Sequence, residues 1–236
     1  MTLQRNYLAC ILFSCLLHGT SIAFCQEAVT AKDPIPSHEE LKVNSATLKE
    51  MRHINVLLPK HYSQSDARFP VLYMLDGGLE EDFPHVAASV EKLVESKQIA
   101  PIILVGIENT ERRRDLTGAT TVAKDREIAP RVGGSADFRA FVRDELMPTI
   151  QRQYRCSEGR AIIGESLAGL FVVETLLLDP KLFNRYIAFD PSLWWNEHRL
   201  LDGSETCLKA LDTTPRHFWF ASSSTEGIQE HSRQLS

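Results

Sequence analysis

Short apolar runs recur along the chain, and each one stops at turn or small polar residues. Runs of this length are typical of strands that are buried on both faces of a parallel sheet. An earlier segment, 51–58 (MRHINVLL), alternates enough to predict a partly exposed strand that ends before Pro59. The buried runs are 69–78 (FPVLYMLDGG), 100–107 (APIILVGI), 160–166 (RAIIGES), 185–190 (RYIAFD) and 216–222 (RHFWFAS).

Helical patterns fill the intervals between these runs. Residues 84–97 and 135–154 each place apolar side chains along one stripe, and in the second we expect Ser135 to cap the helix and Pro148 to kink it. Residues 167–178 are apolar on almost every side, which predicts a buried helix. This alternation predicts an α/β layer fold with a mostly parallel sheet, whose ligands gather at the carboxyl ends of the strands.

The N-terminus has the pattern of an export signal. Arg5 supplies a positive charge, Tyr7 to Leu17 form an apolar core, and small residues near Cys25 suit a cleavage site. The apolar core is shorter than the roughly 18 residues that a membrane span needs, so we expect no transmembrane helix in the mature chain. Residues 1–25 are therefore predicted to be a signal peptide and 26–38 a flexible lead-in, ahead of a periplasmic or secreted domain at 39–236.

Composition narrows the class of protein. The chain has 236 residues, of which 43% are hydrophobic and 24% charged, and this suits a single globular domain. A net charge of -5 argues against a nucleic-acid partner and favours a small molecule. Cys156 and Cys207 lie outside the predicted signal, and they either form a disulfide or remain two separate buried thiols. No metal-ligand spacing occurs among the five cysteines and eight histidines, so no zinc site is expected.

Ser166 is the first candidate for chemistry. It lies in a G-x-S sequence between an apolar strand and an apolar helix, which is the context of a nucleophile elbow. The alternative is a serine that only caps the helix. Ala168 replaces the glycine that usually stands two residues after the serine, and alanine is still small enough for a close approach.

A second candidate lies at the end of an earlier strand, in Leu75 to Gly78 (LDGG). Glycines there allow backbone N–H groups to turn inward, so Gly78 and the N–H of Leu167 are predicted to form an oxyanion hole. The alternative is an ordinary glycine turn.

The order of several motifs resembles the esterase group of the α/β-hydrolase superfamily, which includes siderophore trilactone esterases, S-formylglutathione hydrolase and the mycolyltransferases. The motifs are YMLDGG, VGIENTERRRDLT, FRAFVRDELMPTI, IIGESLAGLFVVETLL and LFNRYIAFDPSLWWN, and the similarity covers roughly residues 40 to 230. The resemblance implies a three-layer α/β sandwich, Ser166 as nucleophile and oxyanion donors at Gly78 and Leu167. It also implies ester or thioester substrates and no cofactor.

Substrate contacts are expected beside the predicted nucleophile. Trp194 and Trp195 either line an acyl or aromatic pocket or pack into the core, with one ring facing inward and the other outward. Arg112, in a run of three arginines, is predicted to hold an anionic group of the substrate, although such a run also suits a solvated surface.

The general base is the difficult part of this prediction. In the family that the chain resembles, the order is serine, acid, histidine, which places the acid at Glu226 or, one strand earlier, at Asp190. Only His231 follows Glu226 in the sequence. His198 precedes the acid, and His217 lies inside a predicted strand.

The family places its histidine after one further strand and before a final helix, which we do not find in this sequence. Three interpretations remain. The sequence is truncated, or the product is a degenerate, non-catalytic binding protein, or His231 serves as the base of a triad with Ser166 and Glu226.

Overall fold

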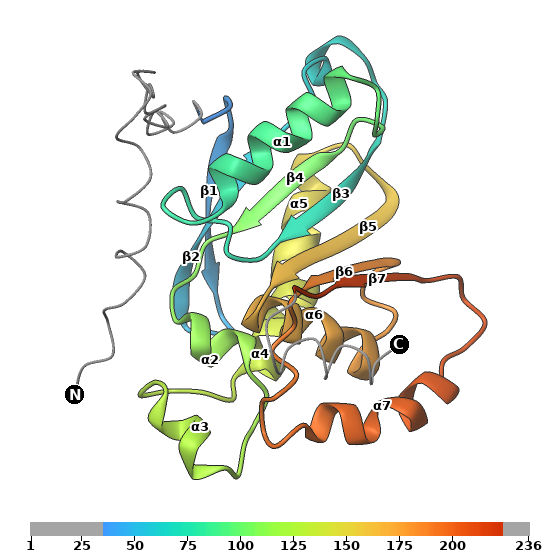
Figure 1. Ribbon diagram of the computed structural model, residues 1–236. Helices are drawn as coiled ribbons and strands as arrows, with labels where there is room; N and C mark the ends of the chain where they lie inside the picture. Colours follow the sequence, from blue (N-terminus) through green and yellow to red (C-terminus); the bar gives the residue numbers. More distant parts are fainter. Residues whose placement is uncertain (1–34, 224–236) are drawn as a thin grey trace, which may run out of the picture. The chain divides into compact units, whose positions relative to one another are not determined.

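The computed structural model describes residues 35–223, and the predicted signal, most of the lead-in, Glu226 and His231 lie outside this range (Figure 1). Seven strands form one sheet in the order β1-β2-β4-β3-β5-β6-β7. The strands are β1 (Glu39–Ser45), β2 (Glu50–Leu57), β3 (Phe69–Met74), β4 (Ile103–Ile107), β5 (Cys156–Glu165), β6 (Arg185–Phe189) and β7 (His217–Ala221).

The sheet is mostly parallel, as the alternating pattern predicts. Strand β2 pairs antiparallel with β1 and with β4, while every pairing from β4 through β3, β5 and β6 to β7 is parallel. All six predicted strands are present. Sequence analysis missed β1, whose side chains lie mostly at the surface and give no apolar run.

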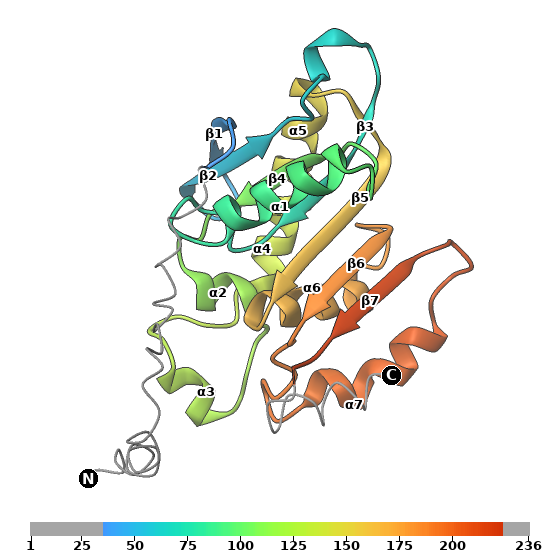
Figure 2. The ribbon, with the colours of Figure 1, turned by 45° about the horizontal axis from the view of Figure 1, so that its top comes forward.

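Helices cover both faces of the sheet. Successive residues of β3 pack on opposite faces of the sheet. Tyr73 belongs to the larger apolar cluster, which contains Phe171 of α6, and Met74 belongs to a smaller cluster, which contains Phe83 of α1. Figures 1 and 2 show α1 and α6 on opposite faces. The helices are α1 (Phe83–Glu95), α2 (Arg112–Leu116), α3 (Ala123–Glu127), α4 (Ser135–Phe141), α5 (Met147–Gln153), α6 (Leu167–Leu178) and α7 (Arg199–Lys209), and a short 3-10 turn spans Tyr62–Gln64. This arrangement is the predicted three-layer sandwich.

The predicted helix at 135–154 is interrupted. A π-helical turn at Val142–Leu146 separates α4 from α5, and Pro148 follows it in the first turn of α5, where a missing N–H is tolerated. The interruption therefore falls at the predicted kink. The predicted cap is wrong: Gly134 precedes the helix, and Ser135 is its buried first residue, whose N–H donates to the Thr117 carbonyl at 3.0 Å.

Helix α6 has the predicted bounds and is buried along ten of its twelve residues.

Two further expectations concern the cysteines and the membrane. Cys156 and Cys207 are free, half-buried thiols, so the disulfide is not formed, and burial raises the pKa of Cys156. Within residues 35–223, no helix combines the length and apolar character that crossing a membrane requires.

Candidate active site

Ser166 occupies the corner between β5 and α6. Strand β5 ends at Glu165 and α6 begins at Leu167, so a single residue makes the turn. Its backbone has φ 57° and ψ -116°, a conformation that a residue with a side chain rarely adopts. Strain at a single residue on a strand-to-helix corner is the geometry expected of a nucleophile elbow.

Two glycines make this corner possible. A Cβ on Gly164 would lie 2.6 Å from the carbonyl carbon of Ala168, and a Cβ on Gly169 would lie 2.8 Å from the Phe189 carbonyl oxygen. The first turn of α6 is therefore packed directly against β5 and the end of β6. Ala168 is tolerated because its neighbour across the turn, Gly164, has no side chain.

The half-buried Ser166 side chain has a partner that the sequence analysis missed. Its hydroxyl oxygen lies 3.2 Å from that of Ser192, and either group can donate. The Ser192 N–H also donates to the Ser166 carbonyl at 3.0 Å, and Ser192 is only 3% exposed. Its sequence signal was weak but present, because Ser192 closely follows β6, the strand next to β5. Among residues 35–223, the Ser166 hydroxyl is bonded to Ser192 and to no histidine.

The two predicted oxyanion donors differ in their surroundings. Leu167 is the first residue of α6, where an N–H has no acceptor within the helix. Gly77 holds the other loop close to β4, since a Cβ there would lie 2.3 Å from the Ile107 nitrogen. The Gly78 N–H, in contrast, donates to a carboxylate oxygen of Glu81 at 2.7 Å.

Arg112 lies near the elbow, but a carboxylate already holds it. Its guanidinium donates to both oxygens of Asp76, at 2.6 and 2.8 Å, and reaches the Glu165 carbonyl at 3.4 Å. The hydrogen bond to Asp76 raises the pKa of Arg112. Because the side chain is still 36% exposed, an anionic substrate group would share it with Asp76.

A basic cavity of about 510 Å³ adjoins Arg112. Arg113 at its wall is exposed and donates to the Ile128 carbonyl, whereas Arg114 pairs with Glu50 and Asp115. The lining residues are Glu111, Arg112, Arg113, Arg114, Ala129, Pro130 and Arg131.

The two tryptophans differ in burial, with one ring facing inward and the other outward. Trp195 is 5% exposed and its indole N–H donates to the Gly118 carbonyl at 2.9 Å, whereas Trp194 is 37% exposed. Trp195 also lines a cavity of about 180 Å³ with Leu170 and Glu174 of α6. The inner ring thus belongs to the larger apolar cluster, and the outer ring is partly exposed.

The remaining polar candidates lie in separate parts of the chain. Asp190 follows β6, and its carboxylate accepts the Ser223 N–H. His217 lies on β7, as expected, and His198 immediately precedes α7. Glu226 and His231 are outside the described residues. Within residues 35–223, no group of three or more His, Cys, Asp or Glu side chains is arranged to hold a metal ion.

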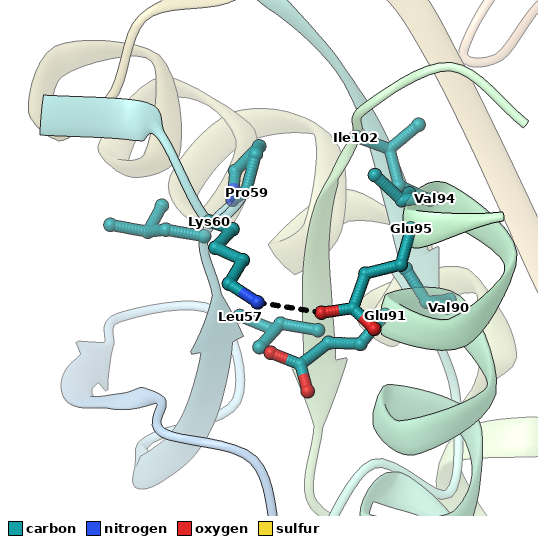
Figure 3. A pocket seen from close by; sticks show the side chains of 9 residues that line it. Leu57, Pro59, Lys60, Val90, Glu91, Val94, Glu95 and Ile102 are labelled. Carbon is teal, nitrogen blue, oxygen red and sulfur yellow. Dashed lines mark hydrogen bonds and ion pairs between the residues drawn. The ribbon is translucent and has the colours of Figure 1, made fainter. Parts of the chain in front are cut away.

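A small cavity of about 30 Å³ lies away from the elbow (Figure 3). It is bounded by the end of β2 at Leu57 and by Ile102, just before β4, so it sits at the amino end of the parallel strands. An ion pair of 2.7 Å between Lys60 and Glu95 spans it. Ser166 is at the carboxyl end, and we therefore place the candidate site there.

Comparison with known proteins gives a family match and several relatives. The family described as "Putative esterase" matches residues 45–229. Ferri-bacillibactin esterase BesA of Bacillus subtilis is 32% identical over 197 residues, which cover 78% of this chain and 65% of that protein. Siderophore triacetylfusarinine C esterase of Aspergillus fumigatus is 28% identical over 178 residues, covering 69% of this chain and 58% of that protein. This chain thus spans less than two thirds of the length of each relative.

A solved structure is similar over most of the described fold. It is an IroE-like serine hydrolase from Shewanella oneidensis, with a TM-score of 0.74 and 31% identity. The match covers 84% of this chain and 66% of that one.

Proposed function

The chain belongs to the putative esterase family of the α/β-hydrolase superfamily, and from this premise we propose that it hydrolyses carboxylic esters or thioesters with Ser166 as nucleophile. The observation that carries the proposal is the backbone of Ser166, held at φ 57° between β5 and α6 by the close packing of Gly164 and Gly169. A serine that only caps a helix has a non-helical backbone, typically in the β region. It does not require the strained positive φ of Ser166.

In the proposed reaction, the Ser166 hydroxyl oxygen attacks the carbonyl carbon of the ester while a general base takes its proton. The negative charge that develops on the carbonyl oxygen is stabilised by the N–H groups of Leu167 and Gly78. The base returns the proton to the leaving alcohol, and water then releases the acid from the acyl-enzyme by the same steps. We assign the base to His231 and its orienting acid to Glu226.

The substrate class follows from the relatives and from local charge. The relatives are named for esters of siderophores, and we propose a siderophore-type ester for this chain as well. Arginines that line the 510 Å³ cavity suit anionic oxygens on such a ligand, because guanidinium groups bind them with two parallel hydrogen bonds. The exposed ring of Trp194 is a candidate contact for its apolar parts.

Labelling with a fluorophosphonate, followed by peptide mapping, tests this proposal. We expect the label on Ser166 and its loss in Ser166→Ala. Ser63→Ala is the matched control, since Ser63 is exposed in the turn before β3, at the opposite end of the sheet. A folded chain with no label at Ser166 would favour the alternative from the sequence analysis, a non-catalytic binding protein.

A further inference from the structure

The Gly78 N–H already has an acceptor, and that acceptor is an anion. The Oε2 atom of Glu81 lies 2.7 Å from the Gly78 nitrogen, while the Glu81 N–H donates to the Gly78 carbonyl at 3.1 Å. The turn from Gly78 to Glu81 therefore folds its last side chain back over its first N–H. A Cβ on Gly78 would lie 2.8 Å from the same Oε2 atom, so the carboxylate rests directly against this glycine.

The other carboxylate oxygen is held as well. The side-chain amide of Asn109, in the loop after β4, donates to Oε1 of Glu81 at 2.7 Å and to Asp76 at 2.6 Å. Asp76 in turn binds Arg112. The position of the Glu81 carboxylate is thus set by the two loops that follow β3 and β4.

The hydrogen bonds that begin at Glu81 continue through Asn109, Asp76 and Arg112 to the elbow. Arg112 reaches from Asp76 to the carbonyl of Glu165, the residue before Ser166, at 3.4 Å. Strands β3 and β5 are parallel neighbours, with Met74 beside Ile163. The Gly78 loop and the elbow therefore both follow the carboxyl ends of these strands. Glu81 is therefore bound on the loop that the proposed function assigns to the oxyanion hole.

We infer that the carboxylate of Glu81 is an internal occupant of the oxyanion site, which must leave the Gly78 N–H before an ester carbonyl can use it. The inference rests on the proposed function. A carboxylate oxygen and a developing oxyanion carry the same charge and seek the same donor, so they compete for it. Glu81 then lowers the reactivity of Ser166 in the resting protein, and substrate binding includes its displacement.

The competing interpretation is a purely positioning role, in which Glu81 holds the loop in shape. The two roles predict opposite effects of truncation. Removal of an occupant frees the donor and speeds attack at Ser166, whereas removal of a support disorders the donor and slows it. Glu81→Ala deletes the carboxylate, and Glu81→Gln keeps the shape while removing the charge.

The experiment measures the second-order rate of fluorophosphonate labelling at Ser166 in folded, full-length protein. Since one oxyanion donor is worth about 10²–10³ in rate, we expect Glu81→Ala to react about 10-fold or more faster than the unaltered chain, with Glu81→Gln between them. Glu91→Gln, which removes the same charge from the exposed face of α1, is the matched control and leaves the rate unchanged.

Added acetate provides a second readout. In Glu81→Ala, acetate should bind the vacated N–H and slow labelling toward the original rate, whereas the unaltered chain at equal ionic strength should not respond. Unchanged or slower labelling in both Glu81 variants would overturn the inference while leaving Ser166 as nucleophile. If Glu81→Ala does not fold, the Glu81→Gln rate alone decides. Absence of label on Ser166 in every variant would instead reject the proposed function.

Discussion

The hydroxyl oxygens of Ser166 and Ser192 lie 3.2 Å apart, although 26 residues separate them in the sequence. Ser192 is buried, and its N–H is fixed to the Ser166 carbonyl, so its side chain cannot move far from the elbow. A hydroxyl held in this way restricts the rotamer of Ser166. It therefore favours one direction for the proposed nucleophile.

We expect Ser192→Ala to lower the rate of fluorophosphonate labelling at Ser166 about 2- to 10-fold, which is the worth of one neutral hydrogen bond. Ser204→Ala is the control, because Ser204 is also buried and bonded, but to the Leu201 carbonyl within α7. A rate that both substitutions leave unchanged would show that Ser192 does not orient the nucleophile.

Glycine substitutions should separate the elbow from the rest of the fold. Gly164→Ala forces a Cβ to within 2.6 Å of the Ala168 backbone, and we expect it to lower the free energy of unfolding by about 1–3 kcal/mol and to suppress labelling. Gly203→Ala is the matched change, because nothing lies within 4 Å of that position on α7. There alanine should stabilise by about 0.5–1 kcal/mol. Urea unfolding measures both, and equal effects would contradict the close packing at Gly164.

Burial explains which elements the sequence could predict. Strands β3 to β7 and helix α6 are apolar enough to stand out, and the bounds of α6 agree residue for residue with the prediction. Strand β1 and helix α7 were not predicted, and both lie mostly at the surface with few buried side chains. The wrong prediction of Ser135 as a cap has a different cause. The Ser135 N–H donates to the carbonyl of Thr117, 18 residues earlier, and no local sequence pattern reveals this partner.

The candidate site was also predictable only in part. Ser166 was predictable because its signal is local, in a strand, a tight turn and a helix that follow one another. The hydrogen bonds from Asn109 to Glu81 and from Arg112 to Asp76 depend on how two loops meet in space. Sequence gives the loops but not their register, so these contacts emerge only from the fold.

Glu50, half-buried at the start of β2, provides a test of the charge network that it forms with Arg52 and Arg114. It accepts hydrogen bonds from Arg114 at 2.6 and 3.0 Å and from Arg52 at 2.9 Å, and the bond from Arg114 is the main reason that the pKa of Glu50 is lowered. A carboxyl with a lowered folded pKa stabilises the protein above its unfolded pKa of about 4.3, and this contribution is lost as pH falls through the folded value.

We therefore expect Glu50→Gln to lower the free energy of unfolding by about 1.5–3 kcal/mol at pH 7, the range for hydrogen bonds to charged groups. The difference from the unaltered chain should shrink as the pH is lowered below about 4. Urea titrations at several pH values measure it, with the exposed Glu40→Gln as control. A difference that stays constant with pH would rule out the charge as its source.

The N-terminal pattern yields a prediction about processing. We propose that the chain is exported and that cleavage removes roughly the first 25 residues, because a positive residue, an apolar core and small residues follow in the expected order. Intact-mass measurement of protein recovered outside the cytoplasm checks this. Soluble exported protein that retains Met1 would contradict it, and Arg5→Glu should reduce the exported fraction.

The last prediction concerns the proposed base. A general base is typically worth about 10²–10⁴ in rate, and loss of one member of a cooperating serine–histidine unit can cost more. If His231 removes the Ser166 proton, His231→Ala and Ser166→Ala should each reduce hydrolysis of p-nitrophenyl acetate by at least about 10²-fold, and the double variant should be no slower than the worse single one. His61→Ala, an exposed histidine before β3, is the control. Glu226→Gln should give a smaller loss, since the acid orients the base without accepting the serine proton. Brisk turnover in His231→Ala would assign the base to another residue, while loss of turnover on Ser166→Ala would still identify the nucleophile.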